Sequence, residues 1–274
     1  MTATIRPMTP DDVQTAADVV LTGGWGDRRL FFAFATSHDR CRPFVAEVEG
    51  EIVGTAVATI NGNAGWVGTV FVAPSARGRG LGGELTDTTI DALEGAGCRT
   101  LVLVATDEGR PIYERRGFEL DTTYHFLEAP GTNIGDRRLH PFRPEDLEPI
   151  AQLDKRATGE DREHLLRAFA SETSAWCMSD DDGLRGFVVR APWGGVATVA
   201  DAIEDGVAIL QACRARAPIT KTVRGGLLAA NREGIQRLRQ LGWVEGRNPP
   251  RLIRGEALDW RPEWLWGQFN FAMG

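Results

Sequence analysis

The sequence predicts an α/β protein built from two copies of one domain, each a twisted mixed sheet with helices on both faces. An apolar, β-branched run at Trp66–Val72 is typical of a buried strand. After a glycine-rich turn, apolar residues spaced four apart at 84–93 indicate a helix. The third observation is a repeat: the opening at 6–13 is echoed, with prolines and acids at matching places, at 140–147.

The join between that strand and helix is the most informative element. Residues 77–83 hold four glycines and two arginines. The first N–H groups of a helix have no partner within it, and they carry the positive end of the helix dipole. Glycines let an anion approach that backbone closely. The join therefore predicts a binding site for a phosphorylated ligand.

The spacing of residues in the join argues against two common nucleotide-binding motifs. Gly78-x-Gly80-x-x-Gly83 matches the dinucleotide fingerprint, but five residues separate it from the strand, and the next strand, at 100–105, ends without an acidic residue. Glu84 stands where a phosphate-binding P-loop has its lysine. An NAD(P)-dependent oxidoreductase is therefore disfavoured but stays open at this point.

Two motifs identify a family. Arg77-x-x-Gly80-x-Gly82 resembles the coenzyme A pyrophosphate loop of the GNAT superfamily of N-acetyltransferases. Downstream, Tyr113-Glu-Arg-Arg-Gly117-Phe118 resembles the second signature of that superfamily. The resemblance implies acetyl-CoA as donor and no metal. It also implies these cofactor-binding residues: Phe71, Val72, Arg77, Gly78, Arg79, Gly80, Leu81, Gly82, Gly83 and Tyr113.

The resemblance also implies a mechanism. The backbone of Phe71 and Val72 would pair with pantetheine and supply an oxyanion donor. Tyr113 is the predicted catalytic residue, because a positioned phenol can protonate a departing thiolate. Gly117 is expected to end its helix with φ > 0, and Phe118 to lie in the core. The strand at 65–72 carries no carboxylate or histidine, so the base stays open between weak candidates and a water chain.

The second copy lacks the features of the first. No Arg-x-x-Gly-x-Gly follows its strand at 186–190, and Leu238 aligns with Tyr113. We therefore expect one acetyl-CoA per chain, bound in the first copy. The predicted domains are 1–131, the acetyltransferase, and 139–274, a degenerate copy, joined by a linker at 132–138.

Two segments of the second copy invite a role. Gly159-Glu-Asp-Arg162 resembles an element of the C-terminal domain of some tandem GNAT proteins; its alternative is a helix start capped by Thr158. Near the C-terminus, Trp264, Trp266 and the offset pair Phe269 and Phe271 alternate as strand residues do. Core packing and a wall of the acceptor pocket are equal alternatives for these aromatics.

Composition is that of a soluble cytoplasmic protein. No apolar run is long enough to span a bilayer, and the N-terminus lacks the apolar core of a signal peptide. The four cysteines are widely spaced without a C-x-x-C pair, which predicts reduced thiols and neither a zinc site nor disulfides. A net charge of −7 argues against a nucleic-acid partner.

The predicted function is direct transfer of an acetyl group from acetyl-CoA to an amine in a ternary complex. The expected acceptor is a small molecule, ahead of a protein or peptide. The alternative is a non-catalytic module that senses acyl-CoA. The expected partners are acetyl-CoA and a small-molecule amine, with no nucleic acid and no membrane, in a monomer or homodimer.

Overall fold

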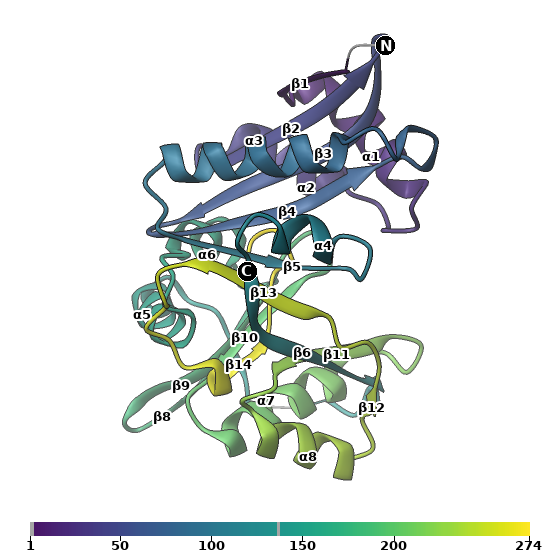
Figure 1. Ribbon diagram of the computed structural model, residues 1–274. Coiled ribbons are helices and arrows are strands. Elements are labelled where there is room, and N and C mark those ends of the chain that lie inside the picture. Colours follow the sequence, from purple (N-terminus) through teal and green to yellow (C-terminus); the bar gives the residue numbers. More distant parts are fainter. Residues whose placement is uncertain (1–2, 136–137) are drawn as a thin grey trace. The chain divides into compact units, whose positions relative to one another are not determined.

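The computed structural model describes residues 3–135 and 138–274, which form two compact units (Figure 1). The first unit comprises Met1–Leu120, Leu252–Glu256 and Phe271–Gly274; the second comprises Asp121–Arg251 and Ala257–Asn270. Residues 136–137 of the predicted linker lie outside the described part of the chain. The domain boundaries at 131 and 139 stay a prediction.

The first unit is a mixed sheet with helices. Its strands are β1 (Ala3–Pro7), β2 (Cys41–Val48), β3 (Glu51–Asn61), β4 (Ala64–Val72) and β5 (Thr100–Val104). Its helices are η1 (Pro10–Asp12), α1 (Val13–Leu21), α2 (Arg29–Ser37), η2 (Pro74–Ala76), α3 (Leu81–Gly95) and α4 (Arg110–Glu114). Strands β1 to β4 are antiparallel neighbours in chain order, and β5 runs parallel to β4. Beyond β5 the order continues with β13 (Pro250–Gly255), a strand from the far end of the chain.

Helix α3 is held on the sheet by one apolar face. Leu81, Leu85, Ile90 and Leu93 are buried at the spacing of helical turns. Ile90 and Leu93 share a core cluster with Val67 of β4 and Leu101 of β5. Leu85 packs with Ala46 of β2 and Ala56 of β3. The strand that precedes the glycine turn and the helix that follows it are therefore fixed by the same core.

The second unit repeats these elements. Its strands are β6 (Glu119–Pro130, from Asp121 onward), β7 (His140–Pro141), β8 (Ala175–Asp180), β9 (Gly183–Arg190), β10 (Val196–Ala200), β11 (Thr222–Leu228), β12 (Val244–Glu245) and β14 (Leu265–Gly267). Its helices are η3 (Pro144–Asp146), α5 (Leu147–Thr158), α6 (Glu163–Phe169), α7 (Ile203–Arg216), α8 (Arg232–Gln240) and η4 (Pro262–Trp264). One sheet has the order β14-β10-β9-β8-β7; β11 and β12 pair with β6.

The duplication predicted from the sequence echoes is visible in the order of elements. Apart from η2, which has no counterpart between β10 and α7, the chain runs through the same succession of strands and helices from β1 to β6 and from β7 to β12. The backbone agrees in detail: Phe118 N–H donates to Tyr113 O at 3.2 Å, and Trp243 N–H donates to Leu238 O at 3.0 Å. Gly117 and Gly242 have φ of 80° and 81°, as helix-ending glycines do.

One of the two interpretations of Gly159–Arg162, the helix start capped by Thr158, is wrong. Thr158 does not cap a helix start but is the last residue of α5, and Gly159, with φ 70°, ends that helix. The next helix, α6, begins only at Glu163. The physical reason is Arg162, which is almost wholly buried and turns back to Asp154 with contacts of 2.6 and 3.0 Å.

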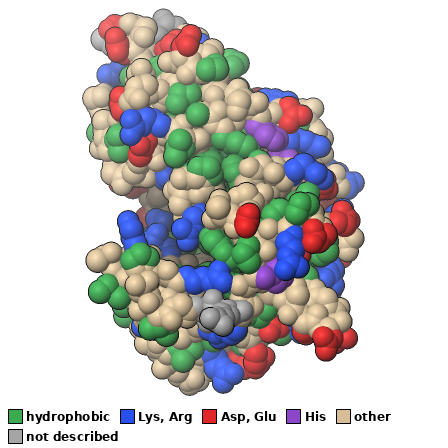
Figure 2. All heavy atoms as spheres, turned by 180° about the vertical axis from the view of Figure 1, so that it is seen from behind, with side chains coloured by type: hydrophobic (Ala, Val, Ile, Leu, Met, Phe, Trp, Pro, Cys, Tyr) green, Lys and Arg blue, Asp and Glu red, His purple; other side chains and the backbone are tan. Residues whose placement is uncertain are grey.

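The surface mixes both signs of charge. On the face drawn in Figure 2, acidic and basic side chains are interspersed with uncharged ones. Among the helices of the described residues, none combines the length and apolar character needed to cross a bilayer. Three of the four cysteines are buried and Cys213 is half-buried, and all four are free thiols.

Candidate active site

Strands β4 and β5 are paired only over the first part of their length. Their parallel pairing is limited to Ala64–Thr100, Gly65–Leu101 and Trp66–Val102. From Val67 onward, one edge of β4 has no strand partner in the described part of this unit. Because β4 runs on to Val72 with an unpaired backbone edge, an extended ligand can add to it as a further strand does.

The free half of β4 contains a bulge that the sequence did not reveal. Thr55 pairs with Phe71 and Val57 with Gly68, so one residue of β3 opposes two of β4. Thr69 has a φ of 50°, rare for a β-branched residue, and its carbonyl accepts a 2.9 Å hydrogen bond from the Thr55 hydroxyl. The bulge re-aims the backbone of Thr69 and Val70. No sequence signal marks it, because threonine is an ordinary strand residue.

The strand leads into a helix start that has no side-chain cap. Gly80 is the N-cap residue of α3, with a φ of 84°, and its carbonyl accepts from the Gly83 and Glu84 N–H groups. Gly78 has a φ of 77°. Both positions lie in the left-handed region, which explains why glycine is needed there. A Cβ built on Gly78 would have no atom within 4 Å, so the space in front of this turn is open.

The two arginines of the turn are exposed, and Arg77 is oriented by backbone. Its Nε donates to the Val72 carbonyl at 3.1 Å, and its guanidinium lies 3.4 Å from Glu108. The side chain thus connects the end of β4 with the loop after β5, beside the helix start. Glycine is favoured at position 83 for a different reason. A Cβ there would lie 2.8 Å from the Arg116 guanidinium, so the glycine leaves room for this side chain to pack on the helix.

Tyr113 is buried beside Phe118. Its residue is 8% exposed, and the two rings meet edge to face with centroids 6.2 Å apart. Burial raises the pKa of Tyr113 to about 12, partly offset by Arg116. No hydrogen bond joins its hydroxyl to another of the described side chains or backbone groups. The phenol therefore keeps its proton and has it available for a ligand.

Glu47, Glu108 and His38, three ionisable groups that could serve as the base, each have another contact partner. Glu47 pairs with Arg6 at 2.5 Å, and Glu108 faces Arg77. His38 directly follows the last residue of α2. Its ring stacks on Phe34, and its Nδ1 accepts from the Arg40 N–H. Through Arg77, Glu108 is connected to the Val72 carbonyl at the end of β4.

Comparison with known proteins matches this geometry. Residues 12–118 match the model of the Acetyltransferase (GNAT) family. The first unit is a GNAT domain. Membership gives acyl transfer as the general class of reaction, and the loop, the parted strands and the tyrosine-bearing helix all lie inside or beside the matched range.

Solved structures extend the GNAT fold to the whole chain. A proposed acetyltransferase from Pyrococcus horikoshii aligns with a TM-score of 0.83 at 19% identity, covering 99% of this chain and 96% of that one. A tandem GNAT protein from the clavulanic acid biosynthesis pathway aligns with a TM-score of 0.60 at 14% identity, covering 93% and 98%. A GCN5-related N-acetyltransferase from Anabaena variabilis ATCC 29413 aligns with a TM-score of 0.59 at 15% identity, covering 92% and 72%. The tandem GNAT fold predicted from the sequence is confirmed.

In the second GNAT-like copy the equivalent gap is filled by the chain itself. Strand β14 pairs with β10, the counterpart of β4, and lies against β11, the counterpart of β5. Trp266 of β14 is fully buried, and a Cβ on Gly206 of α7 would lie 1.9 Å from its ring. An extended ligand would have to displace a packed strand.

The helix start of the second copy carries the wrong charge for a phosphate. Between β10 and α7 stand only Asp201 and Ala202, and the first turn of α7 adds Glu204 and Asp205. Arg185 lies 3.6 Å from Asp201 and 3.3 Å from Asp205. Carboxylates of the chain already occupy the positive end of this helix.

A short C-terminal segment completes the first unit, which sequence patterns did not predict. Ala272 and Met273 are buried, and the Asn61 amide donates to the Met273 carbonyl at 3.0 Å. A Cβ on Gly68 would lie 2.1 Å from Ala272 Cβ. The segment therefore packs against β4 at the point where its pairing with β5 ends.

Proposed function

We propose that the first unit is an N-acetyltransferase that moves the acetyl group of acetyl-CoA to the amine of a small molecule, by direct transfer in a ternary complex. The observation that carries this proposal is the free edge of β4, which ends at an uncapped, glycine-lined helix start. Pantetheine is extended and carries amides, so it suits the free strand edge. A pyrophosphate is an anion, so it suits the helix start.

Each residue predicted from the sequence has a place in this proposal. The backbone of Phe71 and Val72 would pair with pantetheine. The turn from Arg77 to Gly83 would hold the pyrophosphate, with Arg77 and Arg79 supplying charge. The bulge at Thr69 would direct a backbone N–H of β4 at the developing oxyanion.

The role of Tyr113 follows from its environment. With a pKa raised to about 12, the phenol is a weaker acid than a thiol at ~8.5, so complete proton transfer to the leaving thiolate is uphill in free energy. A hydrogen bond from the neutral phenol to the thiolate carries no such cost. We assign Tyr113 the task of donating that bond, with the proton itself supplied through solvent.

Deprotonation of the amine is assigned to water. Strand β4 carries no ionisable side chain, and Glu47 and His38 are engaged in other contacts. The rate should therefore rise with pH until the acceptor amine is neutral, since Tyr113 keeps its proton over that range.

The deciding experiment is calorimetric titration with acetyl-CoA, followed by an assay of thiol release with a panel of small amines. We expect one equivalent bound per chain and release of coenzyme A that depends on the amine. Arg77→Ala should raise the dissociation constant about 10–100-fold, because a charged hydrogen bond contributes ~1.5–3 kcal/mol.

The control for that variant is Arg167→Ala, which removes an exposed arginine of α6 whose partner is Glu163. It should leave acetyl-CoA affinity unchanged. Two equivalents bound, or equal affinity of Arg77→Ala and wild type, would contradict the proposed site. Tight binding without thiol release for any amine would favour the alternative, a module that senses acyl-CoA.

A further inference from the structure

The two units use one place in their fold for different chemistry. In the first unit, Arg6 of β1 contacts Asp12 at 2.7 Å and Glu47 at 2.5 Å. The sequence echo puts His140 in the place of Arg6 and Asp146 in the place of Asp12. The fixed positive charge of the first unit is thus replaced by an imidazole.

Strand register identifies the other two counterparts. Arg6 pairs with Val45, whereas His140 pairs with Cys177. Both β2 and β8 shift register at the next step, between Ala46 and Glu47 and between Met178 and Ser179. An ion-paired arginine with its carboxylates has therefore become a group of imidazole, carboxylate and thiol, with Ser179 at the position of Glu47.

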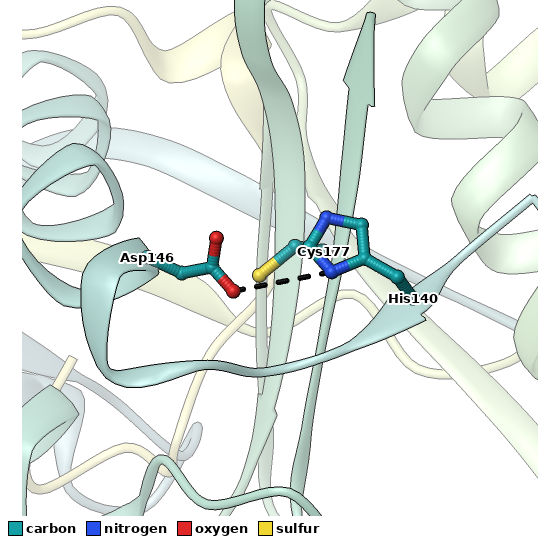
Figure 3. A group of neighbouring side chains, drawn as sticks. All are labelled: His140, Asp146 and Cys177. Atoms are coloured by element: carbon teal, nitrogen blue, oxygen red, sulfur yellow. Dashed lines mark ion pairs between the residues drawn. The ribbon is translucent and has the colours of Figure 1, made fainter.

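The three side chains of the second unit converge. One donor atom from each of His140, Asp146 and Cys177 lies within 4.8 Å of the other two, and Nδ1 of His140 is 3.9 Å from Oδ2 of Asp146. Figure 3 shows the sulfur between the carboxylate and the ring, with each residue coming from a different element. Cys177 is fully buried, while the His140 and Asp146 side chains are 29% and 16% exposed. An ion can therefore enter from the side of the histidine.

The surroundings favour a cation. The Asp146 carboxylate lies beside the Cys177 sulfur, so a negatively charged oxygen and a sulfur donor face the same point. Asp146 is held in place, because its Oδ2 accepts from the Arg143 N–H at 2.7 Å. In the first unit Asp12 contacts the Arg6 guanidinium. Its counterpart in the second unit, Asp146, faces the Cys177 thiol and the His140 imidazole instead.

We propose that His140, Asp146 and Cys177 bind one Zn²⁺ ion in the second unit. Sulfur, nitrogen and oxygen donors together suit this borderline-soft cation, whereas Mg²⁺ and Ca²⁺ require oxygen. On binding, the Cys177 S–H bond breaks, its proton leaves to solvent and the thiolate electron pair forms the bond to zinc. Water fills the fourth position.

The geometry needs only a small adjustment. Zinc bonds of ~2.0–2.3 Å place tetrahedral donors about 3.3–3.8 Å apart, so the widest separation must shorten by about 1 Å. Nδ1 of His140 would exchange its contact with the Pro141 carbonyl for the metal. The other ring nitrogen, 3.4 Å from the Ser179 hydroxyl, would then donate to that oxygen and fix the ring.

The test is titration of the full-length, chelator-treated and reduced protein with Co²⁺, which replaces zinc and is visible. We expect a thiolate-to-cobalt charge-transfer band in the near ultraviolet that saturates at one equivalent and disappears when Zn²⁺ is added. Zn²⁺ should also raise the melting temperature, because it binds only the folded site, and Mg²⁺ should not.

The first unit supplies the variants. His140→Arg and Cys177→Val install the residues that occupy these places in the other copy, and each should abolish the band. Cys213→Ala, at the half-buried thiol of α7, is the control that should keep it. No band with the wild type, or a band that survives either substitution, would overturn the proposal. His140→Arg covers the case in which Cys177→Val fails to fold, because residue 140 is partly exposed.

Discussion

The two helices that follow the central strands, α3 and α7, differ in what covers their N-termini. Eight residues separate β4 from α3, two of them left-handed glycines, and no side chain caps the helix. Two residues separate β10 from α7, and three carboxylates gather there. A similar succession of elements thus leaves an open, uncapped helix start in one unit and a helix start surrounded by the chain's own carboxylates in the other.

The edges of the central strands differ in the same way. Among the residues that the structure describes, the free half of β4 has no strand partner on the side of β5, whereas β10 pairs with β14. An unpaired strand edge buried in a protein leaves backbone groups without hydrogen bonds, which is costly. In the second unit β14 fills the edge of β10. Under the proposed function, the open edge of β4 would bind the ligand, whereas the filled edge of β10 would stabilise the fold.

The largest expected effect is on the stability of the second unit. Arg162→Ala leaves Asp154 buried and unpaired, since both side chains are 1% exposed, and should lower the free energy of unfolding by about 3–5 kcal/mol. Urea unfolding measures it. The paired replacement of Asp154 by Leu and Arg162 by Met should recover most of the loss. Arg167→Ala, which removes an exposed ion pair, should cost less than ~1 kcal/mol.

This variant also sharpens the contrast between copies. Folded Arg162→Ala protein should still bind one equivalent of acetyl-CoA. If the stoichiometry of the folded fraction fell to zero, the division of labour between the units would be refuted.

Tyr113→Phe tests the chemistry assigned to the first unit. The loss of one hydrogen bond to a charged thiolate, ~1.5–3 kcal/mol, should lower kcat about 10–100-fold with little change in acetyl-CoA affinity. Tyr124→Phe, at the chain's only other tyrosine, is the matched control and should keep kcat. Equal rates for the two variants would remove Tyr113 from the mechanism.

Local sequence patterns predicted backbone geometry better than they predicted contacts between residues far apart in the chain. Arg77, Gly80, Tyr113 and Gly117 lie in two short motifs, and the structure gives Gly80 and Gly117 the positive φ that such motifs require. The bulge at Thr69 escaped prediction because it depends on register with β3. The convergence of His140 and Cys177 escaped for the same reason: strand pairing joins residues far apart in sequence.

The sequence also did not reveal that segments near the C-terminus belong to the first unit. Leu252–Glu256 and Phe271–Gly274 belong to the first unit although they lie at the end of the chain. A fragment of residues 1–138, which sequence boundaries suggest for a test of the first copy, would lack both segments. Full-length variants are the sounder comparison.

Gly68→Ala tests the packing of the C-terminal segment on β4. The new Cβ would lie 2.1 Å from that of Ala272, and such overpacking should cost about 1–3 kcal/mol in unfolding free energy. Gly95→Ala is the same substitution at the last residue of α3, where a Cβ meets nothing within 4 Å, and it should stabilise by ~0.5–1 kcal/mol. If the segment also borders the acceptor site, Gly68→Ala should raise KM for the amine. Equal stabilities of the two variants would show that the segment does not pack there.

Tyrosine ionisation gives the sharpest comparison, because each unit holds one tyrosine. Burial raises the pKa of Tyr113 to about 12 and that of Tyr124 further, against ~10 in the unfolded chain. Above pH 10 the unfolded chain therefore binds fewer protons than the folded one. Stability contributed by the neutral phenols is complete below that pH and declines at about 1.4 kcal/mol per pH unit for each tyrosine as pH rises toward the folded pKa values.

The measurement is phenolate absorbance after a rapid pH jump, read before the protein unfolds. The Tyr124→Phe variant reports Tyr113 alone, and the Tyr113→Phe variant reports Tyr124 alone. Saturating coenzyme A should move the Tyr113 midpoint upward by excluding water and leave the Tyr124 midpoint in place. A shift of both midpoints, or of that of Tyr124 alone, would assign the ligand to the wrong copy.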